Sequence, residues 1–194
     1  MARHDDFIII PTLDDNDYTV NQELKEQLTV FGDCVQPVYG RSSSKIHAVN
    51  RDVPKSEWDI IIATSDDMEF IESGFDLQII EHMIKFFPDT DGVLHYPDGF
   101  PHADILSLPV IGRKYYDRQG YIFFPGYVSL FPDEEAIIVG KSLGKLASIQ
   151  YDFVRHNHPA NGVGQMDAQY KYTEKFYPVD KRTFESRKRR NFFV

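Results

Sequence analysis

The sequence contains a single cysteine, Cys34, which excludes an intramolecular disulfide framework. A lone cysteine is typical of a protein in a reducing compartment. The chain also has no charged-then-apolar signal segment at its start and no apolar run near the roughly 20 residues that a membrane helix requires. These absences predict a cytoplasmic protein without a membrane span.

Positive charge is scarce as well. Lysine and arginine number 21 against 30 aspartates and glutamates, which gives a formal net charge of −9. Such a balance disfavours a broad nucleic-acid-binding surface but permits a local basic patch. The basic block of the sequence runs from Lys171 to Val194, and it is explained either by a solvated helix or by contact with phosphate, nucleic acid or an acidic membrane.

Three familiar motifs are missing: a Walker-type glycine loop, a paired Cys-x-x-Cys and a Gly-x-Ser-x-Gly elbow. What the chain does have is apolar content, with 42% hydrophobic and 14% aromatic residues, which is enough to bury a core. We predict one domain over residues 1–194, in which 160–194 form a flexible loop and a basic C-terminal tail.

An apolar run from Ile60 to Ala63 ends on the acidic stretch Ser65-Asp66-Asp67. A short continuous run of isoleucines is typical of a buried strand. In an open α/β sheet the carboxyl ends of the strands face the ligand crevice, and a hard cation relieves the repulsion between adjacent carboxylates. Asp66 and Asp67 are therefore candidate ligands of Mg²⁺ or Mn²⁺, the alternative being that this stretch only turns the chain.

Upstream of that run the pattern alternates between strands and helices. Phe7–Ile10 and Val35–Tyr39 read as strands, while apolar spacing predicts helices over 20–28 and 42–53. Downstream, Gly74–Phe87 carries a Met and Phe stripe that we assign to the core. Such alternation predicts an α/β fold: a Rossmann-like, mainly parallel sheet flanked by helices.

Two further groups of polar residues draw attention. Asp133, Glu134 and Glu135 open a predicted helix, where either the helix dipole or a catalytic role explains acids. His156 and His158 follow the last strand-like run. Side chains at this spacing either reach one site or point to opposite faces.

Taken together, an ordered set of motifs resembles the nucleotide-sugar glycosyltransferases with the A-type fold, in particular a bacterial and phage branch of the family-2-like group. The resemblance covers about Phe7 to Pro159. Its motifs are Asp14-Asp15 after a strand, Gly40-Arg41-Ser42 with Lys45, Ala48 and Asn50, Ser65-Asp66-Asp67-Met68, Asp89 to Tyr96, Ile111 to Tyr116, and Phe131-Pro132-Asp133-Glu134-Glu135.

The resemblance implies an enzyme that moves a sugar from a nucleoside diphosphate sugar to an acceptor hydroxyl, with a divalent cation bridging the motif carboxylates and the diphosphate. It implies an inverting reaction on an acceptor that is a glycan, a protein or modified nucleic acid. By position, the implied metal ligands are Asp66, Asp67 and His156; the donor-side residues are Asp14, Asp15, Arg41, Lys45, Asn50, His95 and Arg113; and the candidates for the catalytic base are Asp133, Glu134 and the competing Glu135.

The chain departs from the family in two ways. Family members begin with one more strand and helix than this N-terminally short sequence, and Ser65 stands where the metal motif usually has an acid. The first departure leaves the strand at Ile8 to Ile10 uncovered, so we expect a homo-oligomer or a partner chain to shield it. Two other functions stay open: a catalytically silent sugar-nucleotide or glycan-binding protein, and a metal-dependent nucleotidyl- or phosphotransferase.

Overall fold

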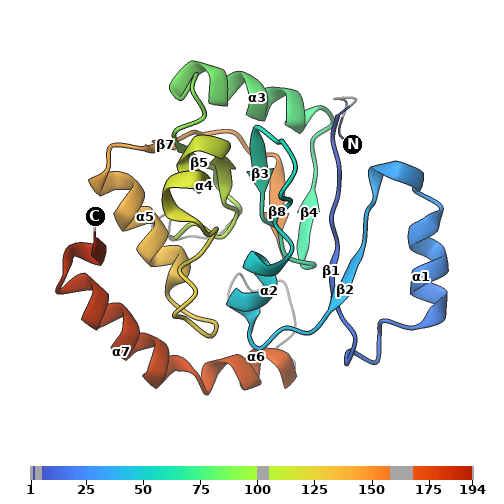
Figure 1. The fold of residues 1–194 in the computed structure, drawn as a ribbon. Coiled ribbons are helices and arrows are strands. Elements are labelled where there is room, and N and C mark those ends of the chain that lie inside the picture. Colours follow the sequence, from blue (N-terminus) through green and yellow to red (C-terminus); the bar gives the residue numbers. More distant parts are fainter. Residues whose placement is uncertain (1, 3–5, 100–104, 158–167, 194) are drawn as a thin grey trace.

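The computed structural model describes residues 2, 6–99, 105–157 and 168–193, and these form a mixed α/β fold (Figure 1). His158 and the predicted loop over 160–167 lie outside these described residues. The strands are β1 (Thr12–Asp14), β2 (Val38–Gly40), β3 (Ile60–Ile62), β4 (Met68–Phe70), β5 (Val93–His95), β6 (Val110–Gly112), β7 (Leu146–Ser148) and β8 (Val154–His156). The helices are α1 (Gln22–Thr29), α2 (Lys45–Arg51), α3 (Phe75–Phe86), α4 (Arg113–Gln119), α5 (Pro132–Ser142), α6 (Ala168–Glu174) and α7 (Tyr177–Lys188), with short 3₁₀ turns η1 (Gly32–Cys34) and η3 (Asn191–Phe193). No described helix has the length and apolar character needed to cross a membrane.

The central sheet has four strands in the order β3-β6-β5-β7. β6 runs antiparallel to both of its neighbours, while β5 and β7 are parallel. Our expectation of a mainly parallel sheet was therefore wrong for this part of the fold. The physical reason lies in the β5–β6 connection, whose sequence contains Pro97, Pro101 and Pro109 and so disfavours the crossover helix that parallel neighbours need.

Successive residues of each strand point to opposite sides of the sheet, and helices cover both of these sides. On one side Leu94 and Val110 pack with Phe75, Ile79 and Met83 of α3, as the Met and Phe stripe predicted. On the other side the core combines strand residues with side chains from α2, α4, α5 and α7; its buried members include Val93, Ile111, Ile46, Tyr115, Ile137 and Phe184. The sheet is thus the middle layer of the fold.

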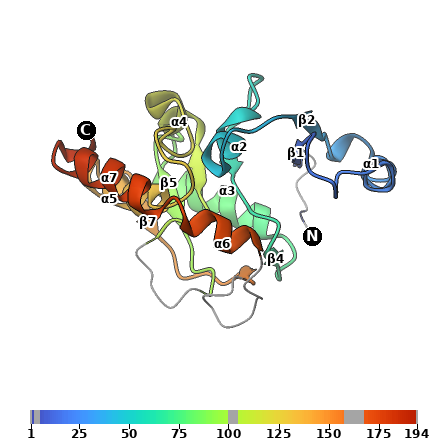
Figure 2. The same cartoon turned by 90° about the horizontal axis from the view of Figure 1, so that it is seen from below.

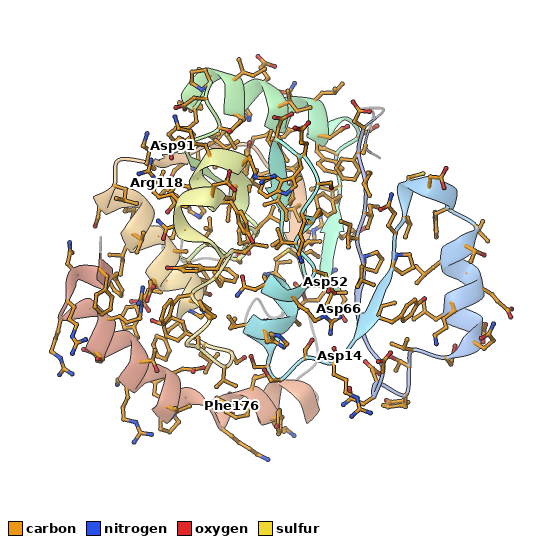
Figure 3. The ribbon with its side chains drawn as sticks, viewed as in Figure 1. Asp14, Asp52, Asp66, Asp91, Arg118 and Phe176 are labelled. Carbon is orange, nitrogen blue, oxygen red and sulfur yellow. The ribbon has the colours of Figure 1, made fainter. Side chains whose placement is uncertain are left out.

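The buried carboxylate of Asp91 links β5 to two neighbouring segments through ion pairs. Asp91, just before β5, receives Arg118 of α4 at 2.5 Å and Lys145 at 2.9 Å (Figure 3). Burial alone raises the pKa of this carboxyl group, but the two cations outweigh burial and lower it. The pair holds α4 and the start of β7 against β5.

The N-terminal lobe, residues 7–40, stands to one side of the molecule in both views (Figures 1 and 2). Its strands β1 and β2 pair in parallel with each other, and among the described residues neither joins the central sheet. α1 has no buried residue, and Asn21 caps it by accepting from the Leu24 amide at 2.9 Å. Ile8 and Ile9 are 51% and 50% exposed, so the described chain does not cover them.

Two segments of the described chain pair with a neighbour on one side. Ile9 forms an isolated bridge with the segment before β2, donating to Cys34 and accepting from Gln36, so the neighbouring Ile8 and Ile10 direct their amides away from that segment. In the same way, the main-chain amide and carbonyl groups of Ile60 and Ile62 point away from β6. β3 is an edge strand of the described sheet. Such edges attract additional strands.

The basic C-terminal segment, for which we expected either a solvated helix or contact with phosphate, nucleic acid or an acidic membrane, contains the helix α7, which docks on the rest of the fold. Asp180 is fully buried and accepts from the amides of Val128, Ser129 and Leu130 at 2.8 to 2.9 Å. Phe184 packs in the core. Lys181, Arg182 and Lys188 of α7 are exposed, whereas Arg187 is buried on the inner face of the helix.

We predict that the chain self-associates, or binds a partner chain, through the N-terminal lobe. Replacing Ile9 with Lys should weaken that association about tenfold to hundredfold, because burying an isoleucine is worth about 1.5 to 3 kcal/mol. Size-exclusion chromatography with light scattering across a dilution series measures the effect. Ile84→Lys, at a 63% exposed position on α3, is the matched control and should associate like the wild type. A 22.5 kDa monomer at every concentration, with no partner bound, would contradict the prediction.

Candidate functional site

The acidic residues after β3 meet a histidine from the far end of the chain. β8 pairs with β4 so that His156 lies opposite Met68, the residue that follows Asp67. The imidazole Nε2 of His156 is 3.3 Å from Asp67 Oδ2, and its Nδ1 is 3.1 Å from Asp98 Oδ2. The structure therefore brings together two of the three predicted metal ligands and adds a second carboxylate behind the histidine.

The third predicted ligand, Asp66, is exposed, whereas Asp67 is half-buried. Figure 3 shows Asp66 toward the same end of the molecule as Asp14, which ends β1. Ser65 donates a short hydrogen bond from its hydroxyl to Asp67 Oδ1. The serine that replaces an acid in the motif thus orients the neighbouring carboxylate.

The charge state of His156 is set by opposing effects. Burial disfavours the imidazolium, but the hydrogen bond with Asp98 and the charges of Asp67 and Asp98 outweigh it and raise the pKa of His156. Two carboxylates around one imidazole are an environment that favours positive charge. A divalent cation in place of the Nε2 proton would bind Asp67, while Nδ1 would still donate to Asp98.

The spacing of these ligands fits a small divalent ion. Two ligands at right angles, with bonds of about 2.1 Å, lie about 3.0 Å apart. The observed 3.3 Å between His156 Nε2 and Asp67 Oδ2 is close to that value. No cluster of three or more potential ligand side chains occurs in the described ranges. Mg²⁺ and Mn²⁺ sites with one or two protein ligands are completed by water and substrate phosphates, so these residues fit such an ion only together with a phosphate ligand.

Asp133 and Glu134 lie in the first turn of α5, as the sequence predicted. Burial raises the pKa of Asp133, while its hydrogen bond with the Glu134 amide and the charge of Lys45 act against the rise. Burial and the charge of Asp133 raise the pKa of Glu134. Raised pKa values on adjacent acids are typical of groups that accept and release protons.

A single connecting segment links the acidic motif with the histidine. The Leu106 amide donates to the Asp133 carbonyl at 3.2 Å. The next residue, Ser107, donates its hydroxyl to Asp98 Oδ2, which also contacts His156. Segments around residues 67, 98, 133 and 156 are therefore held by one chain of hydrogen bonds.

Glu135 does not lie where a base is needed. Its buried carboxylate forms a bidentate ion pair with Arg187 of α7, at 2.8 to 3.0 Å, and accepts from the Tyr127 hydroxyl at 2.7 Å. The guanidinium of Arg187 also stacks on Phe124, 3.4 Å from the ring centre. These donors occupy both oxygens of Glu135, so its engagement within the fold favours a structural role over the predicted role of competing base.

The donor-side residues divide into exposed and engaged ones. Asp15, Arg41 and Lys45 are exposed near the carboxyl ends of β1 and β2 or the start of α2. Asp14 instead accepts from Ser42 at 2.7 Å and Arg51 at 2.9 Å, and Figure 3 shows it near Asp52, the other partner of Arg51. Arg51 thus ties the N-terminal lobe to α2.

Two residues predicted on the donor side have other partners or positions in the fold. The Asn50 side chain accepts from the amides of Ile122 and Phe123 and donates to the Phe123 carbonyl, so it holds a loop. Arg113 donates its amide to the Asp59 carbonyl, which places it at the start of β3, whereas the acidic motif follows the end of that strand. His95 ends β5, which runs in the same direction as β3, and its Nδ1 lies 3.3 Å from Ser148 Oγ.

Sequence reasoning missed Asp98, Ser107 and Asp180. Asp98 stands in a Pro-Asp-Gly stretch that reads as an ordinary turn. Asp180 sits in a first helical turn, where an acid has a dipole explanation. Each becomes informative only when the tertiary structure shows it buried among donors from distant segments.

No protein-family model matches the chain. Part of the sequence is similar to "2-oxoglutarate dehydrogenase, mitochondrial" of Caenorhabditis briggsae, with 29% identity over 93 residues, which is 48% of this chain and 8% of that enzyme. The enzyme of the same name from Caenorhabditis elegans is 28% identical over 93 residues, again 48% of this chain and 8% of the enzyme. The chain thus spans 8% of the length of these curated relatives. No solved structure matches it.

We predict that Glu135→Gln lowers the stability of the fold without affecting ligand binding. Removing one charge of a buried ion pair leaves Arg187 uncompensated and costs about 3 to 5 kcal/mol. Thermal unfolding should therefore shift to clearly lower temperature, while the affinity for a nucleoside diphosphate with Mn²⁺ stays within about twofold of wild type. Glu134→Gln, one residue away and half-buried, is the matched control for stability. Unchanged unfolding in Glu135→Gln would contradict the structural role.

Proposed function

We propose that this chain is a metal-dependent glycosyltransferase that moves a sugar from a nucleoside diphosphate sugar to an acceptor hydroxyl, with inversion at the anomeric carbon. The observation that carries the proposal is the meeting of Asp67 and His156, whose side chains are 3.3 Å apart although 88 residues separate them in the sequence. The motif resemblance assigned both to one cation before any geometry was considered.

The positions of the remaining groups support this assignment. Asp67 follows the end of β3, and His95 ends the co-directional strand β5, so both lie at one edge of the sheet. Ligands of open α/β sheets bind outside the carboxyl ends of the strands. Lys45, whose charge acts on Asp133, supplies a cation suited to a diphosphate at the same site.

The chemistry divides between two groups of residues. When bound, the cation neutralises charge that develops on the departing diphosphate. Asp67 and His156 hold that cation. Asp133 or Glu134 accepts the proton of the acceptor hydroxyl while its oxygen attacks the anomeric carbon, a role suited to carboxylates whose pKa burial has raised.

One observation favours a silent sugar-nucleotide-binding protein as the second candidate. Ser65 occupies an acid position of the motif and binds Asp67 instead of offering a ligand. Loss of one carboxylate weakens the grip on the cation, since each charged ligand adds to affinity. Donor binding without turnover is the outcome that separates this candidate from the enzyme.

The cation prediction concerns Asp67. A nucleoside diphosphate should raise the melting temperature more in Mn²⁺ than in EDTA, because a ligand that binds the folded state stabilises it by mass action. Asp67→Asn should abolish that difference, as measured by differential scanning fluorimetry over a set of nucleoside diphosphates. Asp66→Asn, at the exposed neighbouring acid, provides the comparison. An unchanged metal-dependent shift in Asp67→Asn would remove this residue from the donor site.

The base prediction concerns Asp133. Asp133→Asn should reduce turnover about 10²- to 10⁴-fold if this acid is the general base. Its folded pKa lies above the ordinary 3.8, so ionisation is less favourable in the folded state than in the unfolded state. The contribution of the protonated group to stability is fully present below pH 3.8 and is lost as the pH rises through the raised pKa. Asp133→Asn should therefore melt no lower than wild type at neutral pH. Normal turnover in both Asp133→Asn and Glu134→Gln would make the acidic motif structural.

A further inference from the structure

We propose that Asp98 is a positioning residue, whose buried carboxylate fixes the ring orientation and tautomer in which His156 Nε2 faces Asp67 and the cation. This inference rests on the proposed function and deepens it. No motif of the sequence marks Asp98, and its part in the site follows from contacts alone.

Asp98 holds His156 at two points. The His156 amide donates to the Asp98 carbonyl at 2.9 Å, and His156 Nδ1 lies 3.1 Å from Asp98 Oδ2. A third restraint comes from the pairing of β8 with β4 opposite Met68. With backbone and ring both fixed, the other ring nitrogen can only point toward Asp67.

The environment of Asp98 keeps its carboxylate in place. The residue is 4% exposed, and the Ser107 hydroxyl donates to the same Oδ2 that contacts the histidine. The Asp98 carboxylate is thus satisfied by a donor nine residues along the chain, Ser107, and by the distant His156. Its orientation is therefore set by the fold and does not depend on whether a cation is bound.

The chemistry of the contact decides the tautomer. Ionised carboxylates only accept hydrogen bonds, and Asp98, at 3.1 Å, lies nearer to the ring than Asp67, at 3.3 Å, so the proton of a neutral His156 ring is placed on Nδ1. Nε2 then carries the lone pair, 3.3 Å from Asp67 Oδ2. Cations bind neutral imidazole, and a carboxylate behind the ring both orients it and makes it a better ligand.

The decisive test compares Mn²⁺ binding in matched variants of the full chain, with uridine diphosphate present and free Mn²⁺ measured by electron paramagnetic resonance. Asp98→Asn should bind Mn²⁺ about 10- to 100-fold more weakly than wild type, as is typical when an outer-shell partner is lost. Asp91→Asn provides the matched control, because Asp91 is an equally buried acid whose partners are Arg118 and Lys145, outside the site. It should bind Mn²⁺ like wild type even if it is less stable.

A second readout is independent of the metal and of activity. Nitrogen NMR of the metal-free chain, at a pH above the raised pKa of His156, should show the proton on Nδ1 in the wild type and a mixture of tautomers in Asp98→Asn. Ser107→Ala keeps the carboxylate and should keep the wild-type tautomer.

The possible outcomes separate the inference from the function on which it rests. Wild-type Mn²⁺ affinity in Asp98→Asn, with binding lost in Asp67→Asn, overturns the role of Asp98 and leaves the proposed function standing. A proton on Nε2 in the wild type overturns it as well. A wild-type chain that binds no Mn²⁺ with any of the nucleoside diphosphates overturns the proposed function, and this inference with it.

Discussion

Buried carboxylates hold this structure together at the points where its loops converge. Asp98, Glu135 and Asp180 are each 4% exposed or less, and each accepts hydrogen bonds from segments far away in the sequence. Leaving a buried charge without partners costs several kcal/mol of folding free energy. The loops that these contacts join are therefore held in positions that keep every carboxylate paired. The helix α7 binds the loop before α5 through Asp180 and binds Glu135 of α5 through Arg187, so its contacts lie on both sides of Asp133 and Glu134. The acidic motif therefore keeps its place because of a segment that does not belong to the site.

The sequence predicted those parts of the fold in which one physical pattern dominates. The α3 stripe is strongly apolar and packs in the core as predicted, and the isoleucine run does form the strand β3. The run was expected in a buried, central strand, but β3 is half-buried and stands at the edge of the described sheet, because a run of isoleucines does not reveal how many neighbours the strand has. The reversal of β6 depends on the path of a proline-rich connection, which periodicity does not describe. The docking of α7 depends on Asp180 and Arg187, whose charges in a basic sequence context suggested solvent exposure. A polar residue reveals its role only through its partners, and partners are a tertiary property.

The candidate site shows that the role of a polar residue cannot be read from a sequence motif alone. Asp67 and His156 were paired by resemblance and do lie within 3.3 Å of each other. Asn50 and Glu135 belonged to equally convincing motifs, yet their side chains bind the chain itself. A motif position can be kept for stability or for chemistry, and the two uses look alike in a sequence. Counting the donors that already occupy each oxygen distinguishes them, because an oxygen fully engaged within the fold has little capacity left for a substrate.

The two halves of the proposed site differ in how firmly the fold fixes them. The residues proposed to bind the cation are positioned by the β4–β8 pair and by Asp98. The β4–β8 pair packs against the side of the core that contains α3. The nucleotide half stands on the N-terminal lobe, whose helix α1 buries no residue and whose main polar link to α2 is Arg51. Local stability follows buried apolar contact, so the lobe is the element whose position is least determined by the described chain. Cation affinity should accordingly depend on Asp67, His156 and Asp98, whereas the proposed recognition of the nucleotide depends on how firmly the N-terminal lobe is held. The exposed segment at Ile8 and Ile9 thus bears on the proposed function as well as on stability. The N-terminal lobe is the less firmly held part of the proposed site, so the whole ligand should bind only when a contact over this segment fixes the position of the lobe.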